Sequence, residues 1–374
     1  MSGRWEQMHW HGQHVRAWVP DALGERDVVF SESTIRAAER ATAALSIGND
    51  SLPANWEPLA RLLLRTEGIA SSSIEGVNAP IVEVAVAEQV EVSHNAGWIA
   101  DNLATVSKAV GYDGDLTVSR LHEWHRRLMV HSTLDDSMIG SFRTAPGWIG
   151  GTSPLDAVFV PSPPERIATL IDELVTYANA DHFDPVTQAA LVHAQFETIH
   201  PYGDGNGRLG RILIGWLLSR RGVIDKLPPP ISVMIARDAG GYISGLHLFR
   251  EGPIERYVRW FADVAIASAR QSATMISDVQ AILAEWSRSL SELRADSAAV
   301  LLVPLLPQSP VLTANQVSDL LGVSDRAGRA ALNTLEERGI LEQVEVESQT
   351  PSRGRRSHYY AATALLARAA AWAR

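Results

Sequence analysis

The chain has 374 residues, no cysteine and a formal net charge of −10 at pH 7, with a pI of about 5.6. These properties exclude a disulfide framework, a thiolate metal site and a thiol nucleophile, and they do not match the basic surface of a general nucleic-acid binder. The length is sufficient for two or three domains. Residues 1–5 lack an apolar signal core and no run of about 18 apolar residues occurs, so we expect no membrane span and a cytoplasmic location.

The segment from Leu62 to Gly76 is the first with a chemical pattern. Its apolar residues predict a helix, and Gly76 is of the residue type that often ends one. Ser71 and Glu75 are four residues apart and would lie on the same face of that helix. On its own, this pattern is more typical of a solvated glutamate at a helix end than of a functional contact.

Residues 148–161 contain two short β-prone pieces around a turn rich in glycine, serine and proline. Trp148 and Ile149 precede the turn, and residues 157–160 follow it. This arrangement predicts a β-hairpin over about 149–160. Any exposed hairpin has such a pattern, so the segment alone assigns no function.

The densest group of polar residues lies at a predicted junction between two helices. Asp184 and Pro185 predict the start of an apolar helix that runs to about Ile199. The next twelve residues are His200-Pro201-Tyr202-Gly203-Asp204-Gly205-Asn206-Gly207-Arg208-Leu209-Gly210-Arg211. A glycine-rich turn that opens into a helix directs backbone N–H groups and the positive end of the helix dipole toward one point, which is how proteins hold phosphate. We therefore expect a polyphosphate ligand.

The side chains of this junction have suitable chemistry for a reaction at phosphorus. His200 can take a proton from an incoming hydroxyl, because imidazole titrates near working pH. Asp204 is a hard oxygen ligand suited to a Mg²⁺ ion that bridges phosphates. Arg208 and Arg211 lie three residues apart in the first turn, so both can reach an anion at the helix N-terminus. The buried face of this helix is predicted to consist of Leu209, Ile212, Leu213 and Trp216.

These residues match the motif HxFx[D/E]GNGRxxR, and on them the chain resembles the Fic family of protein adenylyltransferases. Tyr202 stands where the family has phenylalanine; the family aromatic is a core anchor, so the change adds a hydroxyl that needs a partner. By motif order the resemblance runs from about Leu62 to Val264. It implies a mainly α fold, with a Fic-type helical core and a small β-hairpin flap.

The resemblance also implies roles for the matching residues. His200 is the catalytic base and Asp204 holds Mg²⁺. Nucleotide binding falls to Gly203, Gly205, Asn206, Gly207, Arg208, Arg211 and, on the adenine side, Tyr242. Ser71, Glu75 and Gly76 match the inhibitory motif [S/T]xxxE[G/N], in which the glutamate pairs with the second arginine, here Arg211, and blocks the γ-phosphate. The flap over about 149–160 would dock a target segment as an extra strand.

The implied reaction is the transfer of AMP from ATP to a Ser, Thr or Tyr hydroxyl of a target protein or of the chain itself. Relatives that transfer another phosphate-linked group use nearly the same loop. The intact run from Gly205 to Arg208, together with Arg211, favours AMP.

The C-terminal part of the chain resembles a winged helix-turn-helix domain. Thr313 and Gln316 indicate a capping box before a first helix, a turn at 322–324 leads to a second helix, and residues 352–356 form a basic loop in a two-stranded wing. The alternative function is therefore a DNA-binding regulator whose Fic core senses nucleotide. Because acidic residues accompany the arginines of the second helix, packing or dimerisation is the favoured use.

We expect four regions along the chain. They are an N-terminal helical region over 1–110 with the inhibitory helix at about 62–76, a Fic catalytic core over 111–270, a helical connector and linker over 271–310, and a winged helix-like domain over 311–374. The expected partners are ATP, a target hydroxyl at the flap and a second copy of the chain, with DNA at 311–374 the less favoured one.

Overall fold

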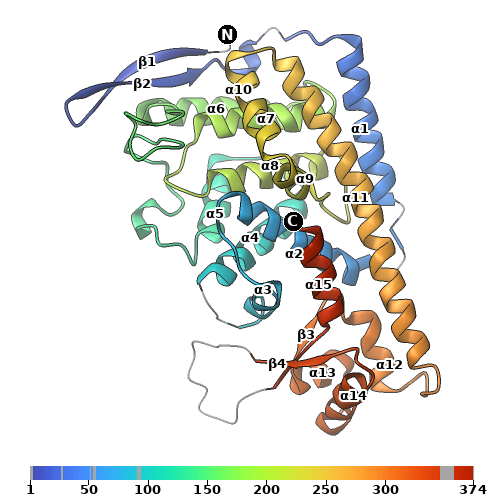
Figure 1. The fold of residues 1–374 in the computed structure, drawn as a ribbon. Helices are drawn as coiled ribbons and strands as arrows, with labels where there is room; N and C mark the ends of the chain where they lie inside the picture. Colours follow the sequence, from blue (N-terminus) through green and yellow to red (C-terminus); the bar gives the residue numbers. More distant parts are fainter. Residues whose placement is uncertain are drawn as a thin grey trace.

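The computed structural model describes residues 3–26, 28–50, 52–53, 56–90, 94–345 and 358–373, and it is mainly helical, as predicted. The chain opens with two antiparallel strands, β1 (Gly3–Trp10) and β2 (Gln13–Pro20), in which Trp5 pairs with Trp18. The turn between them uses positive φ at His11 and Gly12, which suits the twist of a tight hairpin. This hairpin differs from the helical region predicted for 1–110, and it extends away from the helices (Figure 1).

Helices follow the hairpin through the rest of the N-terminal region. They are the 3₁₀ turn η1 (Leu23–Glu25), α1 (Glu32–Asp50), α2 (Trp56–Ile74), α3 (Ile81–Ala87) and α4 (His94–Val110). The predicted inhibitory helix is the second half of α2, which begins earlier than expected. The predicted stop at Gly76 is confirmed: its φ is +77°, and Val77 N donates to Ser72 O at 3.0 Å beyond it.

The central helices enclose the predicted phosphate loop. They are α5 (Val118–Leu128), η2 (Asp136–Met138), α6 (Pro164–Asn179), α7 (Pro185–Ile199), α8 (Asn206–Arg220), α9 (Ile231–Arg237) and α10 (Ala239–Glu251). The predicted start of α7 is confirmed, since Asp184 accepts from Val186 N and Thr187 N and Pro185 is the first helical residue.

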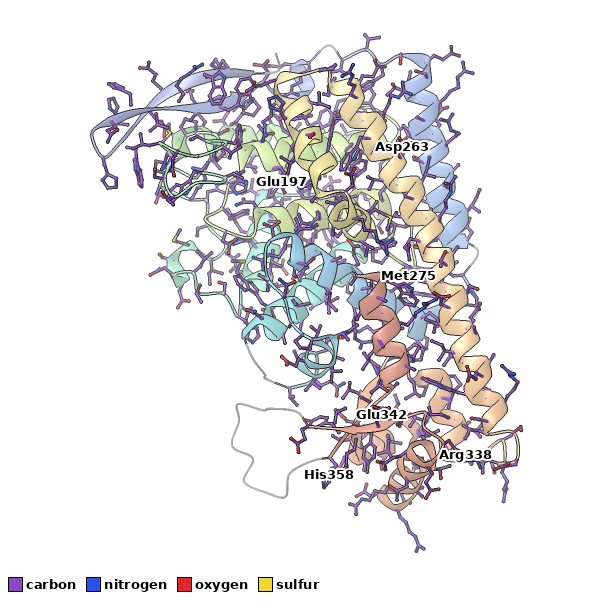
Figure 2. The ribbon with its side chains drawn as sticks, viewed as in Figure 1. Glu197, Asp263, Met275, Arg338, Glu342 and His358 are labelled. Atoms are coloured by element: carbon purple, nitrogen blue, oxygen red, sulfur yellow. The ribbon has the colours of Figure 1, made fainter. Side chains whose placement is uncertain are left out.

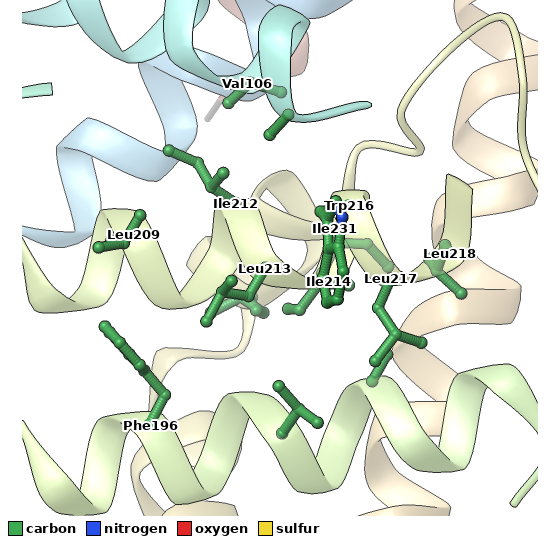
Figure 3. Packing of buried hydrophobic residues seen from close by; sticks show 14 of the residues in the cluster. Val106, Phe196, Leu209, Ile212, Leu213, Ile214, Trp216, Leu217, Leu218 and Ile231 are labelled. Atoms are coloured by element: carbon green, nitrogen blue, oxygen red, sulfur yellow. The ribbon is translucent and has the colours of Figure 1, made fainter. Parts of the chain in front are cut away.

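Helix α8 lies in the middle of the main hydrophobic core and is buried on every side from Asn206 to Leu218. Phe196 points from α7 toward α8, and Ile212 points from α8 toward Val106 of α4 (Figure 3). The four residues predicted to face the core are all buried. The prediction was incomplete, because Arg208 and Arg211 on the other face of α8 are buried as well.

The predicted flap hairpin over 149–160 is reduced to one bridge between Ile149 and Phe159. Its turn is held instead by Asp156, whose carboxylate accepts from the backbone and hydroxyl groups of Thr152 and Ser153. This side-chain capping replaces a strand ladder. On the other side, Trp18 N of β2 donates to Val160 O at 2.9 Å, so the N-terminal hairpin supports the flap.

One long helix, α11 (Ile254–Ser289), packs along α1 and continues without a break across the predicted boundary at 270 (Figure 1). It leads to α12 (Ala298–Leu302) and η3 (Val303–Leu305), so residues 301–310, at the end of the predicted connector and linker over 271–310, are largely packed against the protein. No helix within the described ranges is long and apolar enough to cross a membrane.

The C-terminal module contains the helix pair and the strands predicted for it. The elements are β3 (Val311–Leu312), α13 (Ala314–Leu321), α14 (Asp325–Glu337), β4 (Glu342–Val344), β5 (Tyr359–Ala361) and α15 (Thr363–Trp372). The strands form an antiparallel sheet in the order β3-β5-β4, and the capping box of Thr313 and Gln316 is confirmed. The predicted basic loop at 352–356 lies outside the described residues. Glu342 and His358 mark the two chain segments that flank it in Figure 2.

Candidate active site

The loop between α7 and α8 is held by its own backbone and by one amide side chain. His200 ends α7 in the left-handed conformation, with φ 52° and ψ 63°, and Gly205 precedes α8 with φ 77°. Between them, Tyr202 N donates to Asn206 Oδ1 at 2.9 Å and Asn206 Nδ2 donates to Tyr202 O at 2.9 Å. The side chain of Asn206, predicted to bind nucleotide, therefore serves the loop itself, while its backbone opens α8.

Tyr202 is packed in the core and its additional hydroxyl has a partner. The hydroxyl lies 3.0 Å from His122 Nδ1, and the ring stacks on His125 with centroids 3.9 Å apart. Gly140 N donates to His125 Nδ1, so the proton of His125 is on Nε2, from which it donates to Asp204 O at 3.0 Å. Burial lowers the pKa of His125 to about 4, consistent with this neutral form.

His200 has the protonation state that a general base requires. Burial, and then the charge of Arg143, lower its pKa to about 4, so the imidazole is neutral at pH 7. A fifth of the side chain, 21%, stays exposed, which leaves an approach for a reacting group. Its Nδ1 lies 3.9 Å from Glu197 Oε2, and burial followed by the charge of Glu75 raises the pKa of that carboxyl to about 8. Figure 2 shows Glu197 among the central helices.

Arg143 holds the base in place, and sequence reasoning did not assign it a role. Its Nε donates to His200 O at 2.8 Å and its Nη2 to Ile199 O at 3.4 Å, so it satisfies carbonyls at the C-terminus of α7. The same guanidinium donates to Ala145 O at 3.0 Å and Ser162 O at 2.5 Å, on either side of the flap. Arg143 therefore joins the flap to His200. A lone arginine in a polar stretch carries no spacing signal that could have revealed this.

The contact between Glu75 and Arg211 that the motifs predicted is formed, and its inhibitory role stays a prediction. Arg211 Nη2 donates to Glu75 Oε1 at 2.9 Å and to Ser71 O at 2.8 Å, and Arg211 Nε donates to Ser71 Oγ at 3.0 Å. Burial opposes the charge on Glu75, but the guanidinium of Arg211 prevails and lowers the pKa of Glu75. A side chain at Gly207 would overlap the Glu75 carboxylate, so this carboxylate lies against the N-terminus of α8.

Arg208 contributes a second buried positive charge. Its side chain is 1% exposed, lies over the ring of Trp98 at 4.4 Å, and places Nη2 3.6 Å from Asp204 Oδ2. Within the described part of the chain, Arg208 Nε and Nη1 and Arg211 Nη1 are buried without a hydrogen-bond partner. Buried guanidinium groups of this kind are suited to bind an anion.

Asp204 is the loop residue that could hold a metal. Its side chain is 46% exposed, and Oδ1 accepts from Gly205 N at 2.6 Å. The described residues contain no group of three or more His, Cys, Asp or Glu that could form a metal site by themselves. One carboxylate beside a phosphate site still fits Mg²⁺, which is usually bound by one or two carboxylates together with substrate phosphates and water. Gly203, next to it, is exposed.

Tyr242 lies behind this group rather than in it. It is buried on α10, its hydroxyl lies 3.1 Å from His193 Nε2, and its ring packs against His193 and Trp260. The structure thus brings His200 and Asp204 together with the two arginines and with Glu75 and Ser71. The adenine contact predicted for Tyr242 stays a prediction.

Comparison with known proteins agrees with this geometry. Residues 115–218 match the Fic/DOC family. The proteins named protein adenylyltransferase Fic of Drosophila sechellia and Drosophila melanogaster are each 34% identical over 152 residues, which is 40% of this chain and 28% of theirs. The chain thus matches well under half the length of these curated relatives.

Two solved structures share the fold. A Fic family protein from Desulfovibrio desulfuricans has a TM-score of 0.58 and 20% sequence identity, over 90% of this chain and 98% of that one. A Fic domain-containing signaling protein from Bacteroides thetaiotaomicron has a TM-score of 0.50 and 20% identity, over 66% of this chain and 97% of that one.

Replacing Arg143 by alanine should raise the pKa of His200, because that charge helps to hold it at about 4. Loss of charged hydrogen bonds should also cost roughly 1.5–3 kcal/mol of stability. Arg143→Lys keeps the charge and should leave the pKa closer to wild type. NMR titration of histidine-labelled protein measures this, with His200→Ala to assign the signal. An unchanged pKa in Arg143→Ala would contradict the electrostatic role.

Proposed function

Because residues 115–218 of this chain form a Fic/DOC family domain, we propose that the protein transfers AMP from ATP to a Ser, Thr or Tyr hydroxyl of a target protein or of itself. The observation that carries this proposal is the position of a neutral His200 beside the N-terminus of α8 and two buried arginines. A base next to an anion cradle is the arrangement that attack of a hydroxyl on a bound phosphate requires.

The reaction follows from these positions. The target hydroxyl oxygen attacks the α-phosphorus of ATP, its proton passes to His200, and the bond from the α-phosphorus to the bridging oxygen breaks to release pyrophosphate. The backbone N–H group of Gly207 and the guanidinium of Arg208 stabilise the charge that develops on the phosphate oxygens. Arg143 keeps the acceptor nitrogen in place through the backbone of His200.

Asp204 would hold Mg²⁺ together with the ATP phosphates. The ion would neutralise phosphate charge when bound. Residues of the chain support this arrangement. Asn206 keeps the loop in shape, and Oδ2 of Asp204 lies beside Arg208.

The described state is proposed to be inhibited. The Glu75 carboxylate lies against Gly207 and engages Arg211, the residue proposed to hold the γ-phosphate. A guanidinium already paired with a carboxylate cannot also hold a phosphate oxygen, and a carboxylate there repels the γ-phosphate. ATP bound beside Glu75 would be badly aligned for in-line attack.

Glu75→Gly should raise AMP incorporation at least tenfold, because a charged contact is worth roughly 1.5–3 kcal/mol. The double variant Glu75→Gly with Arg211→Ala should lose this gain, and adding His200→Ala should abolish transfer. Label from ATP that is labelled in its α-phosphate, with intact-mass analysis of the product, measures the amount and the identity of the group. The inhibitory contact is disproved if folded, ATP-binding Glu75→Gly incorporates no more label than wild type.

The same measurement separates the alternatives. A mass increase other than that of AMP would assign another phosphate-linked group to this site. A nucleotide-sensing regulator would transfer no label in any variant, because it binds ATP without transferring a group to a hydroxyl.

Asp204→Asn in the Glu75→Gly background should reduce transfer and raise the Mg²⁺ concentration needed for half-maximal rate, because it removes the charge of the metal ligand. A magnesium titration of label incorporation tests this. Asp156→Asn, on the flap turn, is the matched control and should leave the magnesium dependence unchanged. Equal magnesium curves for Asp204→Asn and its parent would exclude the metal role.

A further inference from the structure

Helix α2 belongs to two hydrophobic cores at once. In its first half, Leu59, Leu62 and Leu63 are buried in a cluster with residues of the C-terminal module, including Leu365 and Trp372 of α15. Near the middle of the helix, Leu64 belongs to the main core around α7 and α8, and in the second half Ser71 contacts Arg211. Figure 1 shows α15, which belongs to the C-terminal module, lying beside α2.

Arg65 lies near the junction of these halves and joins three segments. It is 2% exposed. Its Nε and Nη2 donate to the carboxylate of Glu88, directly after α3, while Nη1 donates to Pro307 O at 3.0 Å and Nη2 donates to Gln308 O at 2.6 Å. Burial lowers the pKa of Arg65, and the charge of Glu88 opposes that shift. The guanidinium thus ties α2 to the connector that leads into the C-terminal module.

Neighbouring contacts strengthen this connection. Gln89, next to Glu88, donates to Val311 O at 3.2 Å and also bonds Gln316 of α13. At the chain end, Arg237 of α9 donates to Trp372 O at 3.0 Å. The module is therefore attached around α2 through polar contacts as well as apolar packing.

From these contacts we propose that the C-terminal module controls the inhibitory contact through α2, with Arg65 as the coupling residue. This inference rests on the proposed function, because it concerns regulation of the same site. From Arg65 to Ser71 is six residues of continuous helix, roughly 9 Å, so a displacement at Arg65 is carried to the residues that hold Arg211. A partner that binds the module better when it is displaced from α2 shifts the population toward a withdrawn Glu75.

The coupling is reciprocal. If detachment of the module from α2 weakens the contact between Glu75 and Arg211, then loss of that contact weakens the attachment of the module to α2 by the same free energy. Glu75→Gly should therefore speed hydrogen exchange in residues 301–310 and α15, far from the substituted residue. A contact that acts only locally would leave exchange there unchanged.

Arg61 provides a matched control for Arg65. It lies one turn earlier on α2 and also pairs with Glu88, at 2.9 Å, but its side chain is 42% exposed. Arg65 also donates to the connector carbonyls, whereas the bonds of Arg61 go to Oε2 of Glu88. Loss of Arg61 tests the effect of weakening the Glu88 pair without releasing the connector.

The experiment compares full-length Arg65→Ala and Arg61→Ala, each alone and combined with Glu75→Gly, by label incorporation from ATP. Arg65→Ala should raise incorporation at least fivefold and Arg61→Ala less than twofold. In the Glu75→Gly background, Arg65→Ala should add less than twofold, because the contact it releases is already gone. No rise with Arg65→Ala, or an equal rise in both backgrounds, overturns the proposal.

Two further measurements keep the test decisive. If Arg65→Ala does not fold, Arg65→Lys becomes the deciding variant, since it keeps the charge but cannot make all four contacts; a rise supports the coupling and no rise overturns it. If Glu75→Gly transfers no label, the proposed function fails. Hydrogen exchange of residues 68–76 then decides the coupling: faster exchange in the Arg65 variant than in Arg61→Ala supports it, and equal exchange overturns it.

Discussion

The positive charge collected at the N-terminus of α8 is the constraint on which the site depends. Arg208 and Arg211 are both buried there, and the helix dipole adds to their charge. Such a concentration of charge inside a protein is costly unless an anion compensates it. In the described state Glu75 is that anion, which is why its pKa falls although burial opposes its charge. A polyphosphate would offer more negative charge to the same groups, so under the proposed function ATP and Glu75 compete for one position.

The loop can present these groups because its backbone is held in conformations that few residues adopt. His200 is one of only two residues other than glycine with positive φ among those described, and such a conformation persists only where its surroundings enforce it. Asn206 holds the loop from within and Arg143 holds it from the flap. His200, the proposed base, is therefore positioned by two side chains that act through the loop backbone.

The sequence predicted local features well and long-range ones poorly. The start of α7 at Asp184, the stop at Gly76 and the pairing of Glu75 with Arg211 follow from capping chemistry and a recognised motif, and the structure has each of them. The N-terminal hairpin was missed. The flap was predicted as a hairpin but is held by one bridge and the Asp156 side chain. The role of Arg143 was missed because the carbonyl groups that it binds come near it only through folding. The residues next to Arg143 in the sequence carry no pattern that indicates this role.

Because α2 packs into two hydrophobic cores, its contacts with them also form in a definite order during synthesis. The ribosome makes α2 before Arg211, and it makes the α15 residues that cover the first half of α2 later still. Domains generally fold as units as they emerge. A nascent chain can therefore complete the central helices around His200 while the first half of α2 still lacks its cover. The support for the part of α2 that holds Glu75 is complete only after α15 has been made, so a product truncated before α15 would carry the loop at His200 without that support.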